Sequence, residues 1–455
     1  MQRTSDAGIW RMVAATTVAA VMLAMGAPQA SVQLPPLVPS GLPRQVCAGP
    51  LIGTTWSTKA LGSTDYDDAA DIAVDEARCA VYVGGYTHGT ISGVSAGLTD
   101  AVVARYDTRG VRTWAVQFGS PGWDSVHGIA VDADGDVYVL GSTDDTLPGS
   151  PIINLGASDI FLVKLDSAGA IVWTRMLGSA GDENPTGLAI DSAGEVYITG
   201  FTDGVLTGAT AGGQDYFLGR YDPDGNLVML MQRGSAGNDR AKAVAVGPSD
   251  NPYIVGDTDG DLEGVQAGNA DIFVAKYDPA GTELWIDQRG TSDLDLGADI
   301  AVNQYAEVFV AGSTALGMDG NVSAGAMDVV LLRYSASGTW TFTRQRGSTS
   351  TDTSESLALT SGGAPIIMGS TSGTLDGLVP VGSTDAFVMK LNRSGIWSWT
   401  SQIGSTGYDR GEGVAVGFAD QVFATGNFGA SLNGVSPIGL RDMFAVSFTS
   451  GGVLR

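Results

Sequence analysis

Residues 187–200 read GLAIDSAGEVYITG and residues 216–231 read YFLGRYDPDGNLVMLM. Together they hold four short runs rich in β-branched and aromatic residues, with Asp, Pro and Gly between them. Such runs predict β-strands, and the Asp-, Pro- and Gly-containing segments supply the backbone angles of tight reversals. We therefore expect four antiparallel strands, at 187–191, 196–200, 216–221 and 227–231.

The same unit recurs seven times and is marked each time by a Gly that follows a β-rich run. The spacing between successive markers is 56–59 residues, and the markers are Gly62, Gly119, Gly178, Gly234, Gly290, Gly347 and Gly404. A fixed period of this size, built from short strands, predicts a propeller in which each copy is one blade. The expected fold is all-β, a seven-bladed β-propeller of four-stranded antiparallel blades over residues 56–455.

The two ends of the repeat region predict how the ring closes. The last copy stops at Arg455, one residue before the position where copies two, three and five carry a Trp. The first copy begins with the missing strand, at Trp56–Leu61. We expect this N-terminal strand to complete the seventh blade, since that pairing removes an open sheet edge.

The repeat resembles the secreted bacterial seven-bladed β-propeller repeat family, of SBBP type. Copies in that family read W-x-x-x-x-G, G-[IV]-A-V-D-x-x-G-x-V-Y-V-x-G-x-T and D-x-F-V-x-K-[YL]-D. This chain matches with Trp173 and Gly178, with 187–200 and Thr202, and with DIFLVKLD at 159–166. The resemblance covers about 400 residues, and Phe428 departs from it where the other copies have Thr. It implies a secreted or surface-exposed propeller and supplies no common catalytic motif.

The first 55 residues predict export. Arg3 and Arg11 precede an apolar stretch over 12–25 and small residues through Ala30, which is the layout of a secretory signal peptide at 1–30. Uncleaved, the same segment would serve as an anchor, and no other transmembrane segment is expected. Residues 31–55 contain four prolines within 31–49 and form a linker or N-terminal segment. We expect a secreted or cell-surface protein, with the periplasm as an alternative.

The chain has two cysteines, Cys47 and Cys79. An even number suits an oxidising compartment. Cys79 lies in the first turn of blade one, and Cys47 precedes Trp56 by nine positions, a tether that spans up to ~30 Å. A disulfide between Cys47 and Cys79 is the prediction, with two buried thiols as the alternative.

The formal net charge of −25, from 24 basic and 49 acidic residues, repels nucleic acid. It favours cations or basic partners and also keeps a protein soluble. The partner is therefore expected to be a protein or a carbohydrate, and the propeller is expected to be monomeric.

Acidic residues recur at two positions in all seven copies, five residues after the marker Gly and just before the third strand. Both positions lie at turns on one face, so that face should carry two rings of carboxylates. The first set is Asp67, Asp124, Glu183, Asp239, Asp295, Asp352 and Asp409, and the second set is Asp100, Asp159, Asp215, Asp271, Asp328, Asp385 and Asp442. A structural role, in which each carboxylate accepts backbone N–H groups, fits residues present in every copy.

Calcium is the one cofactor that the composition suggests, because Ca²⁺ takes six to eight oxygen ligands. The richest loop offers Asp257, Asp259, Asp261 and Glu263, without the full spacing of an EF-hand. The chain has only two histidines, which excludes a three-His zinc site.

Side chains that depart from the repeat are the best candidates for a ligand site. On the acidic face they are Trp123, His127, Arg240, Lys242, Tyr408, Arg410 and Glu412. No nucleophile–base motif is visible, which favours a non-catalytic binding or scaffold propeller. The alternative is a hydrolase or lyase at the channel mouth that uses non-equivalent carboxylates and His127, and a quinone-bearing propeller is a third class. Clustering of these departures in one pocket would favour an enzyme, and scattering would favour a scaffold.

Overall fold

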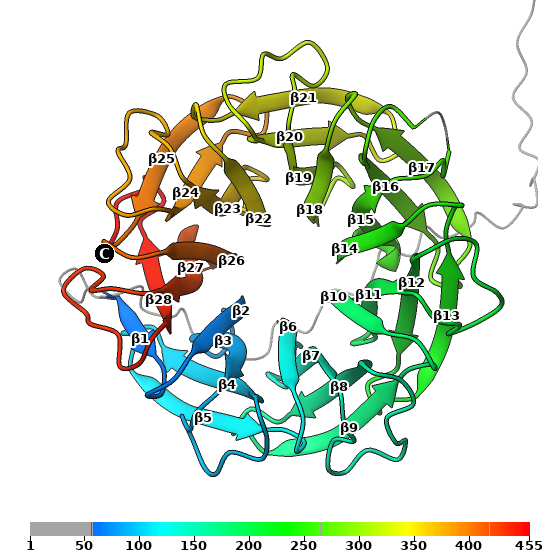
Figure 1. Cartoon of the computed structure of the whole chain (residues 1–455), viewed down its shortest axis with the longest axis vertical. Helices are drawn as coiled ribbons and strands as arrows, with labels where there is room; N and C mark the ends of the chain where they lie inside the picture. The colour runs from blue at the N-terminus through cyan, green and yellow to red at the C-terminus, as the bar shows by residue number, and fades with distance from the viewer. Residues whose placement is uncertain (1–55, 57, 264–265, 418) are drawn as a thin grey trace, which may run out of the picture. The chain divides into compact units, whose positions relative to one another are not determined.

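The computed structural model describes residues 56, 58–263, 266–417 and 419–455. Within them, seven four-stranded antiparallel sheets stand as blades around a central channel (Figure 1). The only helical turn of the described part is η1 (Pro248–Asp250), between the first two strands of blade four. The seven-bladed all-β architecture predicted from the repeat is confirmed.

Each of the first six blades is built from four consecutive strands. Blade one contains β2 (Asp67–Asp75), β3 (Ala80–Thr87), β4 (Asp100–Asp107) and β5 (Arg112–Phe118). Blade two contains β6 (Asp124–Val131), β7 (Val137–Thr143), β8 (Asp159–Leu165) and β9 (Ile171–Leu177). Blade three contains β10 (Glu183–Ile190), β11 (Val196–Thr202), β12 (Asp215–Tyr221) and β13 (Leu227–Arg233).

The next three blades repeat this order. Blade four contains β14 (Asp239–Val246), β15 (Pro252–Thr258), β16 (Asp271–Tyr277) and β17 (Glu283–Arg289). Blade five contains β18 (Asp295–Val302), β19 (Val308–Thr314), β20 (Asp328–Tyr334) and β21 (Trp340–Arg346). Blade six contains β22 (Asp352–Leu359), β23 (Pro365–Thr371), β24 (Asp385–Leu391) and β25 (Trp397–Ile403).

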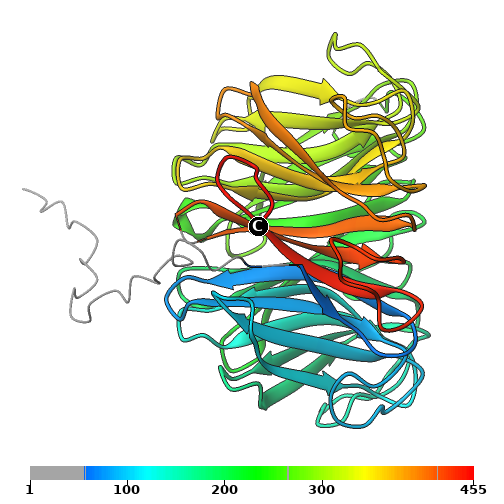
Figure 2. The ribbon, with the colours of Figure 1, turned by 90° about the vertical axis from the view of Figure 1, so that its left-hand side faces the viewer.

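Blade seven is completed by the N-terminal strand, as predicted. Its own strands are β26 (Asp409–Gly417), β27 (Gln421–Phe428) and β28 (Asp442–Phe448). Strand β1 (Lys59–Leu61) pairs antiparallel with β28 along the outer edge, so the two ends of the propeller lie side by side (Figures 1 and 2). Trp56 is fully buried, with its ring centroid 5.2 Å from that of Phe423 in blade seven and 5.9 Å from that of Tyr106 in blade one.

The apolar residues form their core between blades rather than within one. Strand β8, for example, is buried along its whole length, and its side chains pack with those of neighbouring blades. A blade that is apolar on both faces needs a neighbour on each side, which explains why the ring must close.

The first strands are longer than the sequence analysis predicted. In blade three the inner strand begins at Glu183 instead of residue 187, because Glu183 pairs with Thr202 at the end of β11. Both recurring acidic positions are therefore the first residues of strands. They lie together at the face where the inner strands begin, which we call the mouth face.

Candidate functional site

Every inner strand carries a β-bulge at the same place, and this bulge builds the channel wall. The pairing register shifts by one residue around the fourth position of each inner strand. A bulge leaves its extra residue unpaired and re-aims its side chain. The seven extra residues, here called the bulge residues, all line one cavity of about 130 Å³ in the channel: Ala70, His127, Thr186, Lys242, Ala298, Glu355 and Glu412.

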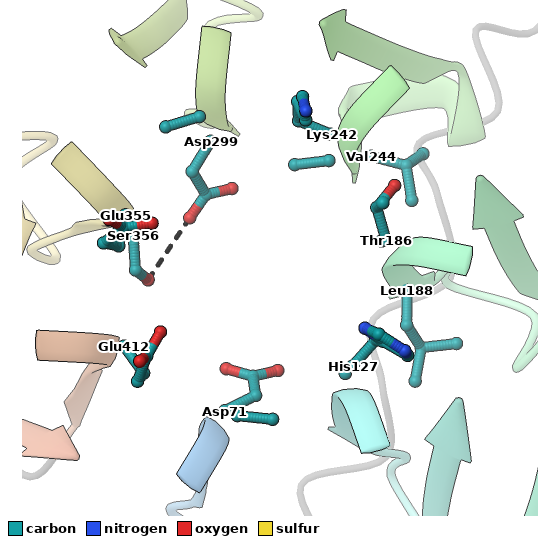
Figure 3. Close-up of a pocket in the computed structure, with 15 residues that line it drawn as sticks. Asp71, His127, Thr186, Leu188, Lys242, Val244, Asp299, Glu355, Ser356 and Glu412 are labelled. Atoms are coloured by element: carbon teal, nitrogen blue, oxygen red, sulfur yellow. Dashed lines mark hydrogen bonds between the residues drawn. The ribbon is translucent and has the colours of Figure 1, made fainter. Parts of the chain in front are cut away.

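Charged side chains from different blades meet in this cavity. Asp71, His127, Lys242, Asp299 and Glu412 come from five different inner strands and surround the same space (Figure 3). Burial raises the pKa of Asp71 to about 6 and that of Asp299 to about 7, and the charge of Asp71 adds to the second shift. The channel can therefore take up protons near neutral pH.

Asp71 and Asp299 also join neighbouring blades. Asp71 Oδ2 accepts the backbone N–H of Ile129 in blade two at 2.9 Å. Asp299 Oδ2 accepts the N–H of Leu357 in blade six at 2.6 Å. These bonds partly offset the cost of burying the two carboxylates.

A larger cavity of about 350 Å³ opens between blades seven, one and two, and we call it the channel mouth. It is lined by aromatic, charged and amide side chains, among them Asp68, Tyr86, His127, Tyr408, Arg410, Glu412, Asn427 and Arg441. Its volume lies at the lower end of the range of small-molecule sites.

Exposed aromatic rings mark the mouth face of the same three blades. Tyr408, Tyr66 and Trp123 occupy the position just before the inner strand in blades seven, one and two, with exposed fractions of 47%, 44% and 49%. His88 lies edge-on to Trp123, with 5.4 Å between the ring centroids. The Arg441 guanidinium lies 5.7 Å from the centre of the Tyr66 ring. We call Tyr408, Tyr66 and Trp123 the aromatic arc.

Arg410 connects two bulge residues. Its guanidinium lies 3.1 Å from Glu355 Oε1 and 3.3 Å from Glu412 Oε1, and Asn427 Nδ2 donates to Glu412 Oε1 at 3.1 Å. Burial raises the pKa of Glu412 to about 8 against the opposing charge of Arg410, and Glu355 adds to the rise. Glu412 therefore holds a proton at neutral pH despite its basic neighbour.

His127 lies within hydrogen-bond distance of Ser142, with 3.0 Å between Nε2 and Oγ. The side chain is exposed to the channel, and partial loss of hydration between the channel walls lowers the pKa of His127 below its usual range. The imidazole is thus neutral at pH 7 and carries a free electron pair or a hydrogen-bond donor as the tautomer requires.

In blade four two of the predicted ligand-binding residues, Arg240 and Lys242, form ion pairs with the predicted metal ligand Asp257. Lys242 Nζ lies 3.2 Å from Asp257 Oδ1, and Arg240 contacts the other carboxylate oxygen at 3.6 Å. Asp257 is 2% exposed, and burial raises its pKa against the two cations. These contacts give Asp257 cationic partners within the protein.

The other residues of that loop do not converge on one point. Asp259 Oδ2 accepts a bond from Asn238 Nδ2 at 2.8 Å, whereas Asp261 and Glu263 are exposed. Among the described residues, no three His, Cys, Asp or Glu side chains are placed to hold a metal ion. Calcium binding stays a prediction, and a thermal melt in Ca²⁺ and in chelator, with Asp259→Asn as control, tests it.

The two acidic rings are hydrogen-bonded within their own blades. In the first ring, Asp352 Oδ2 accepts the backbone N–H and the hydroxyl of Ser348, and Thr371 donates to Oδ1. In the second ring, Asp328 Oδ2 accepts the N–H of Ala324 at 2.7 Å and the side-chain amide of Gln345 at 2.8 Å. These bonds pin the turns at Asp352 and Asp328, and a structural role for both rings stays a prediction.

The structure places the candidates from the sequence in two groups. His127, Tyr408, Arg410 and Glu412 line the channel mouth, and Trp123 belongs to the aromatic arc beside it. Lys242 lies deeper in the channel, and Arg240 is its neighbour at Asp257.

Sequence analysis missed several residues of this site: Tyr66, Asp68, Asp71, Tyr86, His88, Ser142, Asp299, Glu355, Asn427 and Arg441. An alignment of the seven copies on the first acidic position would have placed the bulge residues in one column, three residues after that position.

The predicted disulfide falls partly outside the described residues. Cys79 closes the first turn of blade one with φ of 56°. Cys47 is not among the described residues, and neither are the predicted signal peptide at 1–30 and linker at 31–55. The disulfide and the export signal therefore stay predictions.

The fold and its channel define this chain as a seven-bladed β-propeller. The family model of the SBBP beta-propeller repeat matches residues 113–147 and 172–206 of this chain. The resemblance noted from the motifs is thereby confirmed. No described helix has the length and apolar character needed to cross a membrane.

Two relatives share part of this sequence. The regulatory protein FlaEY of Caulobacter vibrioides is 28% identical over 375 residues, which cover 72% of this chain and 39% of that protein. An uncharacterized WD repeat-containing protein of Acanthamoeba polyphaga mimivirus is 23% identical over 275 residues. The match covers 46% of this chain and 20% of that protein. This chain thus spans less than half the length of either relative.

Two solved structures are similar to this chain at low sequence identity. The WD40 domain of Neurospora crassa Pan2 is 11% identical with a TM-score of 0.48, and covers 86% of this chain and 95% of its own. The polysaccharide lyase Uly1 is 11% identical with a TM-score of 0.46, and the match covers 86% of this chain and 91% of the lyase chain.

Proposed function

We propose that this protein is a secreted or cell-surface binding module whose ligand docks at the channel mouth and the aromatic arc. The aromatic arc carries this proposal, because three consecutive blades expose a large ring at one position beside one cavity. Side chains with an apolar body and a polar tip are enriched where proteins bind ligands.

A carbohydrate is the ligand class that fits best. A cavity of about 350 Å³ accommodates one or two sugar rings, and the surrounding Asp68, Asn427 and Arg441 offer acceptors and donors for hydroxyl groups. The charges of the mouth are already paired, Arg441 with Asp68 and Arg410 with Glu355. Such pairing favours a polar, neutral ligand over a strongly charged one.

The second candidate is a hydrolase or lyase at the same mouth. Its support is the clustering of four of the candidate residues around one cavity, including a protonated Glu412 and a neutral His127. Two groups whose pKa values are pushed apart in this way are the pattern of an acid and a base.

Binding of an oligosaccharide array to the purified chain tests the leading proposal. We expect a set of glycans retained by the wild type and lost in the Trp123→Ala/Tyr408→Ala variant. Tyr305→Ala is the matched control, since Tyr305 is 59% exposed but lies in the turn between β18 and β19, on the face opposite the mouth.

The same glycans also separate the two candidates. Unchanged glycans after long incubation support a binding module, and shortened glycans support the enzyme. Failure of every glycan to bind, with capture of a protein ligand that depends on the same two residues, would move the proposal to a protein partner.

A further inference from the structure

A repeated hydrogen bond joins consecutive blades near the mouth face. In three blades the next-to-last residue of the second strand lies beside the third residue of the next inner strand. Ser313 Oγ accepts the N–H of Ser354 at 3.0 Å, and Ser370 Oγ accepts the N–H of Gly411 at 3.2 Å. Asn427 Oδ1 accepts the N–H of Ala69 at 2.7 Å. In blades five, six and seven an oxygen atom of this side chain thus accepts a bond that helps to hold the ring together.

Blade two carries a serine at this position without that hydrogen bond. Ser142 occupies the same position, opposite Ser125 in the register of β6 and β7. The third residue of the following inner strand is Pro185, which has no backbone N–H to donate. The hydroxyl of Ser142 lies instead 3.0 Å from Nε2 of His127.

His127 is itself placed for chemistry. It is the bulge residue of blade two, it lines both the channel cavity and the channel mouth, and its side chain is exposed to the channel. Ser142 is half-buried and adjoins the mouth through its contact with His127, which lines that cavity. A hydroxyl and a neutral imidazole within hydrogen-bond reach form the core of an activated nucleophile.

We infer that Ser142 and His127 form a nucleophile–base pair that accepts an acyl group from a carboxylic ester bound in the channel mouth. Ser142 Oγ forms a bond to the carbonyl carbon of the ester, and its proton passes to His127 Nε2. The bond from that carbon to the alcohol oxygen breaks, and the alcohol leaves with the proton from His127. A water oxygen then forms a bond to the same carbon while His127 Nε2 takes a proton from the water. The bond from the carbon to Ser142 Oγ breaks, Oγ regains a proton from His127, and the carboxylic acid leaves.

Labelling by a fluorophosphonate probe tests the pair directly, because an activated serine displaces fluoride from phosphorus. We expect one adduct per chain, located on Ser142 by peptide mass spectrometry. His127→Gln should lower the labelling rate at least ~100-fold, the usual contribution of a general base. Ser313→Ala is the matched control and should label like the wild type, since its hydroxyl serves only the bond to Ser354.

Pro185→Ala gives a second test that leaves both reacting groups in place. It restores an N–H opposite Ser142, which should engage the hydroxyl and lower the labelling rate about tenfold, the equivalent of one net hydrogen bond. The inference is overturned if Ser142→Ala labels as fast as the wild type, or if folded His127→Gln keeps the wild-type rate. An unchanged rate in Pro185→Ala would overturn the argument from the missing N–H. Glycan binding is measured separately, so its failure and the failure of labelling are distinct results.

Discussion

The backbone of Gly347 passes directly over the carboxylate of Asp328, so that a Cβ on Gly347 would lie 2.0 Å from Oδ1. The other six marker glycines have the same relationship to the second acidic ring, with distances of 2.1–2.4 Å to the nearest carboxylate atom. The marker Gly and the Asp before the third strand therefore form one structural unit in each copy. Each copy needs both, because the carboxylate pins the turn and only Gly lets the chain cross it.

Gly347→Ala should lower the free energy of unfolding by about 1–3 kcal/mol, the cost of forcing an extra methyl group into a packed site. Urea unfolding measures the change. In Gly347→Ala/Asp328→Ala the losses should be less than additive, since the clash disappears with the carboxylate. Gly362→Ala is the control, because its nearest contact is Thr360 Oγ1 at 4.0 Å. A loss as large in the control would refute this explanation of the repeat.

Trp56→Ala should open the closure between blades seven and one. Trp56 is fully buried between Phe423 and Tyr106, and such a truncation costs about 3–5 kcal/mol. The matched control is Trp123→Ala, which removes a ring that is 49% exposed and should change stability by less than about 1 kcal/mol. Equal urea midpoints for the two variants would contradict a closing role for the N-terminal segment.

Much of this fold could be predicted from the sequence because seven copies carry the same pattern of strand and turn residues. Strand order and blade number follow from residues such as Gly347 and Asp328 that every copy has, and closure follows from the strand at Trp56–Leu61 that the last copy lacks. The channel residues could not be found in this way, since His127, Lys242 and Glu412 occupy one position with different side chains. Their meeting depends on the bulge and on ring closure, neither of which a single copy reveals. Ser142 stands out only once Pro185 is placed beside it.

Stability should fall as the pH rises from about 4.5 to about 8. In that window the folded protein holds a proton on Glu412, whose pKa is raised from 4.5 to about 8, whereas the unfolded chain has released it. Glu412→Gln removes this linkage, so its free energy of unfolding should decline less steeply, by up to ~1 kcal/mol per pH unit. Urea unfolding at a series of pH values measures both slopes. Glu263→Gln, at an exposed position, serves as the control. If the stability of Glu412→Gln declined with pH as steeply as that of the wild type, Glu412 would ionise normally in the folded protein.

Peptide mapping under non-reducing conditions should recover a linked peptide that contains Cys47 and Cys79. The two are the only cysteines of the chain, so no other internal pairing competes. Reduction should then lower the melting temperature, since the bridge would tie the N-terminal segment to blade one. Recovery of both residues as free thiols from protein exported to an oxidising compartment would rule the bridge out.

A crystal structure of the chain with the tightest oligosaccharide from the array is the most direct test of the central claim. The account predicts sugar rings stacked on Tyr408, Tyr66 or Trp123, with hydroxyl groups bonded to residues of the channel mouth such as Asp68 and Asn427. An oligosaccharide bound on the opposite face, or on the outer strands away from blades seven, one and two, would contradict it.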